Sequence, residues 1–224
     1  MNGKALIGIA AAAVMAAGGV VYAVTADNDG GDRTAAIGTT FDASTVKVQS
    51  LSAQGSGCTS QTVTASLTSD RKSLNLRYAT GTPASTNPPG EMWASVRPGE
   101  LTARANCSAA AVLTVPARWT FAITSVEHRV DMYTAHPTGG HWSARILALL
   151  RSAGQSVTDR TISSAERQGR FTDVVTIPAS NLKWSPCSPT GGVPVAATVS
   201  MTASGDGASV KLYDQNFSLV WRAC

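Results

Sequence analysis

The sequence predicts an all-β fold, an antiparallel β-sandwich stabilised by two disulfides. Three observations support this prediction. Short runs of apolar residues alternate with polar residues along most of the chain, and clusters of turn-forming residues separate these runs. Four cysteines follow an apolar N-terminal segment. Many short strands separated by turns favour two antiparallel sheets packed on each other.

The expected strands follow from alternation with a period of two residues. Residues 63–67 and 74–78 alternate on either side of a polar turn at 69–72, which predicts a hairpin. An Asp-Gly pair within 204–207 predicts a second hairpin turn, because this pair tolerates the positive φ values of tight turns. The segment 144–153 fits either a helix or a buried strand. Further β-rich runs lie at 46–48, 112–114, 119–123, 174–177, 195–202, 210–213 and 217–221.

An export signal opens the chain. Lys4 precedes a run of apolar and small residues at 5–24, and Val-Thr-Ala at 24–26 offers the small side chains that signal peptidase recognises. We therefore expect a signal peptide of residues 1–26. The alternative is a segment kept as a membrane anchor, because about 20 apolar residues can span a bilayer.

The mature protein is expected to be secreted and extracellular, without membrane contact once the signal is cleaved. Residues 27–43 are rich in Asp, Gly and Thr and predict a flexible leader, followed by a single β-sandwich domain at 44–224. Cleavage removes one Lys and no acid, so the net charge falls from +4 to +3. Lys and Arg are scattered along the chain, which argues against a nucleic-acid partner.

Cys58, Cys107, Cys187 and Cys224 are an even set, which indicates two disulfides in an exported protein. Four cysteines permit three pairings. We favour Cys58–Cys107 and Cys187–Cys224, because each bond then joins flanking strands within one half of the domain. Zinc ligation is disfavoured, since no two cysteines have the close spacing that structural zinc sites usually show.

The residues around the cysteines resemble a known family. The motifs are Gly55-Ser56-Gly57-Cys58, Asn106-Cys107, Trp119-Thr120-Phe121, Glu127-His128-Arg129, Trp184-Ser185-Pro186-Cys187 and Trp221-Arg222-Ala223-Cys224. In this order they resemble a secreted family of fungi and actinobacteria, catalogued as domain of unknown function four-three-six-zero, over roughly residues 46–224. Thr59 and Val130 depart from it, since the family often has Pro and Gly there. The resemblance implies secretion and a disulfide-stabilised domain, and it implies no activity.

Tryptophan provides the candidate binding residues. The chain has five tryptophans and few other aromatic residues, and an exposed indole offers a broad apolar surface on which a sugar can stack. Trp93 follows a Pro-rich loop and Trp142 follows a Gly-rich one, so these two are predicted to be exposed ligand-binding residues. Trp119, Trp184 and Trp221 are predicted to be core residues, the last two packed around a disulfide.

Two classes of function remain open. The first is a non-catalytic extracellular or cell-envelope domain that binds a glycan, a wall polymer or a protein. The second is a small secreted hydrolase or metalloenzyme, which requires acidic and imidazole side chains to converge in one pocket. No cofactor is predicted, and no His-Glu-x-x-His or Gly-x-Ser-x-Gly motif is present. This second class predicts that two or more of six residues converge in one pocket, namely His128, His136, His141, Glu91, Glu127 and Asp131.

Two asparagines, in Asn106-Cys107-Ser108 and Asn216-Phe217-Ser218, fit the acceptor pattern for N-glycosylation. The pattern makes Asn106 and Asn216 candidate attachment sites in an exported protein. Whether they carry a glycan depends on the host.

Overall fold

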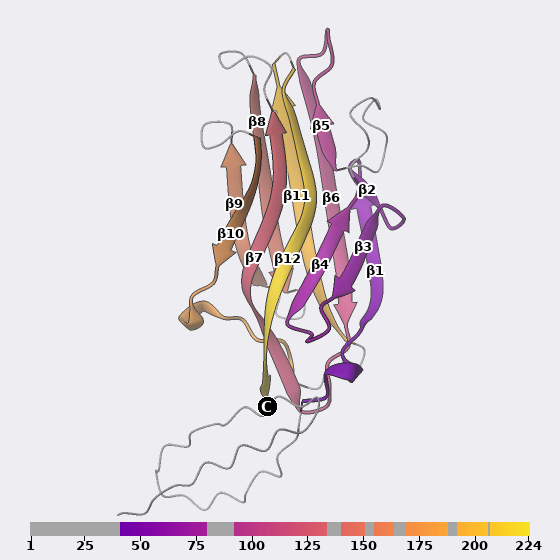
Figure 1. Ribbon diagram of the computed structural model, residues 1–224, viewed down its shortest axis with the longest axis vertical. Helices are drawn as coiled ribbons and strands as arrows, with labels where there is room; N and C mark the ends of the chain where they lie inside the picture. Colours follow the sequence, from indigo (N-terminus) through magenta and orange to yellow (C-terminus); the bar gives the residue numbers. More distant parts are fainter. Residues whose placement is uncertain are drawn as a thin grey trace, which may run out of the picture. The chain divides into compact units, whose positions relative to one another are not determined.

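Two antiparallel β-sheets pack together in the computed structural model (Figure 1). The unit that contains them runs from Ala43 to Cys224. The structure describes residues 41–79, 92–133, 140–150, 155–163, 169–187, 192–205 and 207–224. The predicted signal peptide, most of the leader and most of the Pro-rich loop lie outside these residues. Within the described ranges, no helix has the length and apolar character needed to cross a membrane.

Twelve strands and two short 3-10 turns make up the described elements. The strands are β1 (Val48–Gly55), β2 (Cys58–Thr59), β3 (Val63–Leu67), β4 (Ser73–Tyr78), β5 (Trp93–Ser95), β6 (Thr102–Leu113), β7 (Trp119–Tyr133), β8 (His141–Leu150), β9 (Gln155–Ser163), β10 (Gly169–Thr176), β11 (Val193–Ser204) and β12 (Ser209–Ala223). The 3-10 turns are η1 (Ala43–Thr45) and η3 (Ala179–Asn181).

The first sheet, sheet A, has the strand order β2-β1-β6-β11-β8-β9, and the second, sheet B, has the order β10-β7-β12-β4-β3. The short strand β5 pairs with the first residues of β12, and β4 pairs with later residues of β12. From β5 onward, every pair of consecutive strands lies in different sheets except β8 and β9, which are neighbours in sheet A. The predicted all-β sandwich with two disulfides is confirmed.

Local sequence explains the two expected hairpin turns. In the turn between β3 and β4, the Thr68 hydroxyl donates to the Asp70 carboxylate at 2.6 Å, and that carboxylate accepts the Lys72 N–H at 3.0 Å. Gly205 and Gly207 both have positive φ in the turn between β11 and β12, which glycine adopts without steric cost. Both predicted turns are therefore present.

Residues 144–150 of the segment that fitted a helix or a strand belong to strand β8, and residues 151–153 lie outside the described residues. Ala144, Ile146, Ala148 and Leu150 are all buried, while the residues between them are more exposed. β8 pairs with β11 on one side and with β9 on the other. The apolar residues alone fitted both a helix and a strand. Hydrogen bonding to a partner strand along each edge makes the segment a strand.

The core between the sheets contains many alanines from sheet A together with large apolar side chains from both sheets, such as Leu113, Ile146 and Met201 of sheet A. Sheet A contributes the fully or nearly fully buried alanines Ala105, Ala109, Ala111, Ala144, Ala148 and Ala197. Sheet B contributes the buried side chains of Leu74, Leu76, Phe121, Val126, Leu212 and Phe217. A mixture of small and large buried residues allows two sheet faces to interdigitate at the density of a protein interior.

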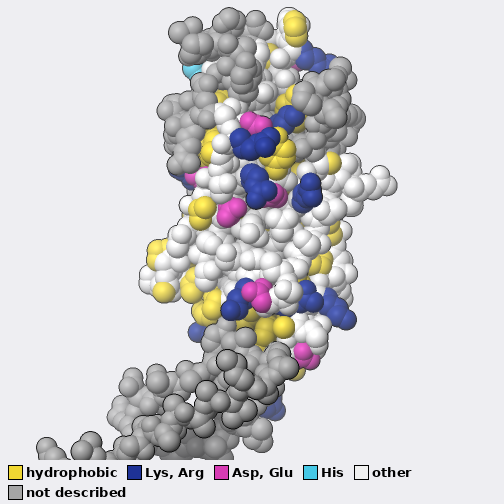
Figure 2. Space-filling model, viewed as in Figure 1, with side chains coloured by type: hydrophobic (Ala, Val, Ile, Leu, Met, Phe, Trp, Pro, Cys, Tyr) yellow, Lys and Arg dark blue, Asp and Glu magenta, His cyan; other side chains and the backbone are white. Residues whose placement is uncertain are grey.

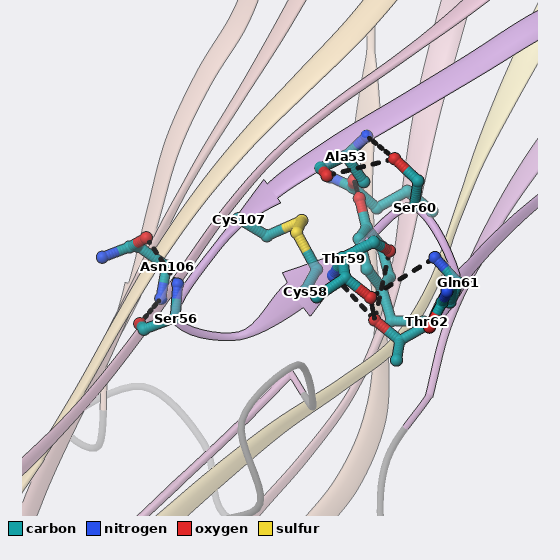
Figure 3. The surroundings of a disulfide bond; sticks show 11 residues. Ala53, Ser56, Cys58, Thr59, Ser60, Gln61, Thr62, Asn106 and Cys107 are labelled. Atoms are coloured by element: carbon teal, nitrogen blue, oxygen red, sulfur yellow. Dashed lines mark hydrogen bonds between the residues drawn. A yellow bond between two sulfur atoms is a disulfide. The ribbon is translucent and has the colours of Figure 1, made fainter.

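The predicted disulfide pairing is confirmed. Cys58 of β2 is bonded to Cys107 of β6, and both residues are buried (Figure 3). Cys187 is bonded to Cys224, and both of these residues are exposed. The first bond therefore fixes the short edge strand of sheet A to a strand further inside that sheet, and the second holds the end of the chain after β12 to the segment after η3.

Gly192 precedes β11 in a position that excludes a larger residue. Its φ is +85°, and an added Cβ would lie 2.7 Å from Val112 Cγ1 and 2.8 Å from the Leu113 carbonyl oxygen. Gly99 has nearly the same φ, +84°, but an added Cβ would meet nothing within 4 Å.

Urea denaturation of Gly192→Ala and Gly99→Ala separates backbone strain from the clash. We expect Gly192→Ala to lower the free energy of unfolding by about 1–2 kcal/mol more than Gly99→Ala, and equal losses would contradict the clash.

Candidate functional site

The two tryptophans predicted to be exposed are buried. Trp93 is 9% exposed and Trp142 is 2% exposed. Trp142 occupies an inward position of β8. The ring of Trp93 is in contact with Lys211, whose ammonium lies 4.1 Å from the ring centroid. The prediction that these residues form an exposed stacking platform is therefore wrong. The adjacent loops suggested exposure, but strand alternation turned Trp142 toward the core.

The proposed hydrolase or metal-binding residues do not converge in the part of the chain that the structure describes. Glu127 and Asp131 are half-buried positions of β7, whereas His128 on the same strand is fully buried. His141 is exposed at the start of β8, in the other sheet. No group of three potential metal ligands occurs among the described residues. Glu91 and His136 lie outside them.

A polar hollow of about 320 Å³ lies on the outer face of sheet B. In Figure 2, which views the molecule from the side of sheet B, basic and acidic side chains gather over the upper part of β7 and β12. We call this surface the arginine hollow. It is lined by Asn75, Arg77, Arg129, Arg170, Tyr213 and Asp214.

Strand register explains why residues far apart in sequence share this surface. Residues paired directly across antiparallel strands point to the same face of a sheet. One continuous row of such pairs crosses sheet B from β10 to β3. The row is Thr172, Arg129, Asp214, Arg77 and Thr64. The hollow is thus built across the strands, on rigid backbone.

A β-bulge in β12 brings an aromatic ring into the hollow. Leu212 and Asp214 pair with consecutive residues of β7, which leaves Tyr213 as the extra residue. Tyr213 and Asp214 both line the hollow, and the buried positions shift from Val210 and Leu212 before the bulge to Phe217 after it. This site was not predicted from the sequence. The one sequence feature that could have indicated it is a shift in the alternation of apolar residues between the expected runs 210–213 and 217–221. These were predicted as separate runs, whereas both belong to the single strand β12.

Ion pairs fix most of the charged groups of the hollow. Arg129 lies 3.2 Å from the Asp214 carboxylate, and Arg170 lies 3.4 Å from the Asp131 carboxylate. The Tyr213 hydroxyl donates to Asp131 at 3.2 Å and accepts from Arg170 at 3.3 Å. Tyr213 and Asp131 together raise the pKa of Arg170 above its usual value.

Arg77 differs from the other two arginines of the hollow. Its side chain is exposed, and it forms no ion pair or side-chain hydrogen bond within the residues that the structure describes. It therefore presents its guanidinium to the surface.

A chain of buried polar side chains lies on the inner side of the same strands. Tyr78 donates to the Gln215 side-chain oxygen, and the Gln215 amide nitrogen lies 3.3 Å from His128 Nδ1. Each of these residues follows or precedes a lining residue in sequence, so its side chain points inward where the neighbour points outward. Burial raises the pKa of Tyr78 above its usual value and lowers the pKa of His128 to about 4. The chain braces β4, β12 and β7 beneath the hollow.

Comparison with protein families identifies the chain. Residues 44–224 match the model of a family described as a domain of unknown function, DUF4360. The chain belongs to the DUF4360 family. The resemblance that the cysteine motifs indicated is therefore confirmed. A search of curated proteins finds no match to the DUF4360 chain.

Solved structures similar to the DUF4360 domain include carbohydrate-binding modules. TmCBM27, which recognises mannan, is 7% identical with a TM-score of 0.31, and the match covers 81% of this chain and 91% of that one. The xylan-binding module CBM15 is 12% identical with a TM-score of 0.29, covering 63% and 95%. A family 11 module from Clostridium thermocellum is 10% identical with a TM-score of 0.22, covering 77% and 83%. At these values, the matches carry no argument about a ligand of the DUF4360 domain.

Proposed function

We propose that the DUF4360 domain is a non-catalytic extracellular binding domain that holds a glycan or wall polymer in the arginine hollow. The observation that carries this proposal is the hollow itself. Its volume of about 320 Å³ falls at the lower end of the range of about 300–1,000 Å³ found for ligand sites. Guanidinium groups donate hydrogen bonds, whereas Asn75 and Tyr213 both donate and accept them. A ligand rich in hydroxyl groups requires this mixture.

The charged groups of the hollow suit binding more than proton transfer. Asp214 and Asp131 are each engaged by an arginine, so neither is a free carboxylate poised to act as an acid or a base. The lining residues stand on paired strands and not on loops, which limits the side-chain order lost when a ligand binds. Two disulfides favour an oxidising, extracellular location, and we propose that cleavage after Ala26 releases the domain there.

A pull-down with the oxidised protein on a panel of insoluble polysaccharides and wall fractions tests the proposal. We expect retention on at least one polymer, and we expect Asn75→Ala to weaken it by about tenfold through the loss of hydrogen bonds to the ligand. Asn181→Ala is the matched control, because this exposed asparagine in η3 lines a different hollow. No retention on any polymer, or loss on Asn181→Ala alone, would contradict the proposal.

A further inference from the structure

We infer that the polymer held by the DUF4360 domain is an acidic polysaccharide and that one of its carboxylates binds Arg77. This inference rests on the proposed function and specifies the ligand class of the same site. It starts from a second hollow, of about 300 Å³, beside the first. We call it the threonine hollow. Its lining residues are Gln61, Thr62, Thr64, Arg77, Tyr78 and Ala79.

Arg77 lines both hollows. Its register partners are Asp214 of β12, in the arginine hollow, and Thr64 of β3, in the threonine hollow. The two hollows therefore continue one another across the strands, with the Arg77 side chain at their junction. A ligand long enough to fill both must pass over this guanidinium, which favours a chain of several sugar units over a single small molecule.

The charge balance of the surface identifies the ligand group. Arg129 and Arg170 are paired with Asp214 and Asp131, whereas Arg77 has no ion-pair partner among the described residues. A carboxylate complements this charge and also the planar guanidinium, which can donate two parallel hydrogen bonds to it.

Arg77 is a single unpaired cation, so it fits a polymer with a carboxylate on a sugar unit better than a densely charged polyphosphate, which requires several cations. The acidic residue Glu127 supports Arg77 as the position where the ligand carboxylate binds. It occupies the next row of the same face, directly paired with Asn216. A ligand carboxylate is repelled there. Arg77 lies on β4, so β12 separates it from Glu127 on β7.

The experiment compares polymers that differ only in charge. Polygalacturonate and its methyl ester have the same sugar chain, and alginate and a neutral glucan extend the comparison. We expect the oxidised protein to bind polygalacturonate or alginate at least tenfold more tightly than the uncharged polymers, with binding weakened by added salt.

Variants at one position then test the role of Arg77. We expect Arg77→Gln to weaken binding of the acidic polymer by about tenfold and to leave binding of the ester unchanged, with partial recovery in Arg77→Lys, which retains the charge without the planar fork. Arg104→Gln is the matched control, because Arg104 is an exposed arginine of β6 in sheet A.

The outcomes separate the inference from the proposed function. Equal binding of acid and ester that Asn75→Ala still weakens would overturn the acidic ligand and leave the binding site in place. Preference for a phosphate polymer, such as a teichoic acid, would also overturn it. If no polymer of either kind bound, both the inference and the proposed function would fall.

Discussion

Replacing Cys58 and Cys107 together by alanine is expected to lower the free energy of unfolding by about 4 kcal/mol. This bond closes a loop with a sequence separation of 49 residues, and in the chain-entropy model a loop of this length restricts the unfolded chain by about that amount. The two cysteines are 1% and 2% exposed, so alanine at both sites also leaves unfilled volume in the interior. Urea denaturation of the oxidised protein measures the change.

The second disulfide provides the matched comparison. Cys187–Cys224 has a separation of 37 residues, for which the chain-entropy model gives nearly the same stabilisation of about 4 kcal/mol. These cysteines are exposed, so their replacement by alanine removes little buried volume. We therefore expect the Cys58/Cys107 variant to be the less stable of the two. A smaller loss for the buried pair would show that packing around Cys58 and Cys107 adds nothing.

The fold was predictable because its signals are local. Alternation in 63–67 and 74–78 and the turn residues between them predicted one hairpin, and an even number of cysteines after a predicted export signal predicted two disulfides. Both features are present. For the segment at 144–153 the sequence left helix and strand open, since adjacent leucines fit both periods. The pairing partners that decide this, β11 and β9, are contributed by distant parts of the chain.

The candidate site was not predictable from single motifs because it is made by register across strands. Arg77, Arg129 and Arg170 are scattered in sequence, and only the pairing of β4, β12, β7 and β10 places them on one face. The tryptophans suggested a site because they are rare and large. Large size also means that burying a tryptophan removes much apolar surface from water, which stabilises the core. Both Trp93 and Trp142 are buried.

Acidification is expected to destabilise the domain through His128. The imidazole is fully buried, and burial, more than the nearby Arg160 guanidinium, lowers its pKa to about 4, while Asp173 acts in the opposite direction. In the unfolded chain its pKa is near 6.5, so the unfolded state binds the proton more readily. The stabilisation is therefore complete above about pH 6.5 and is lost as the pH falls toward 4.

The size of this effect follows from the two pKa values. Between about pH 7.5 and pH 4.5, protonation of the unfolded state is expected to lower the free energy of unfolding by about 2.5 kcal/mol. Urea denaturation at the two pH values measures it. His128→Gln removes the titrating group and is expected to abolish most of the drop, whereas His141→Gln, at an exposed position of β8, is expected to retain it.

If His128→Gln fails to fold, NMR titration of the unmodified protein tests the same prediction. The imidazole C–H resonances of the unmodified protein report the protonation of each histidine, and we expect one histidine to remain neutral down to about pH 4.5. His128 can stay neutral there because its imidazole is buried, which lowers its pKa. Its ring lies 3.3 Å from the Gln215 amide, which Tyr78 in turn holds by a hydrogen bond. If all histidines titrated near pH 6.5, the buried chain would be open to water, and β4, β12 and β7 would lack the internal brace beneath the arginine hollow.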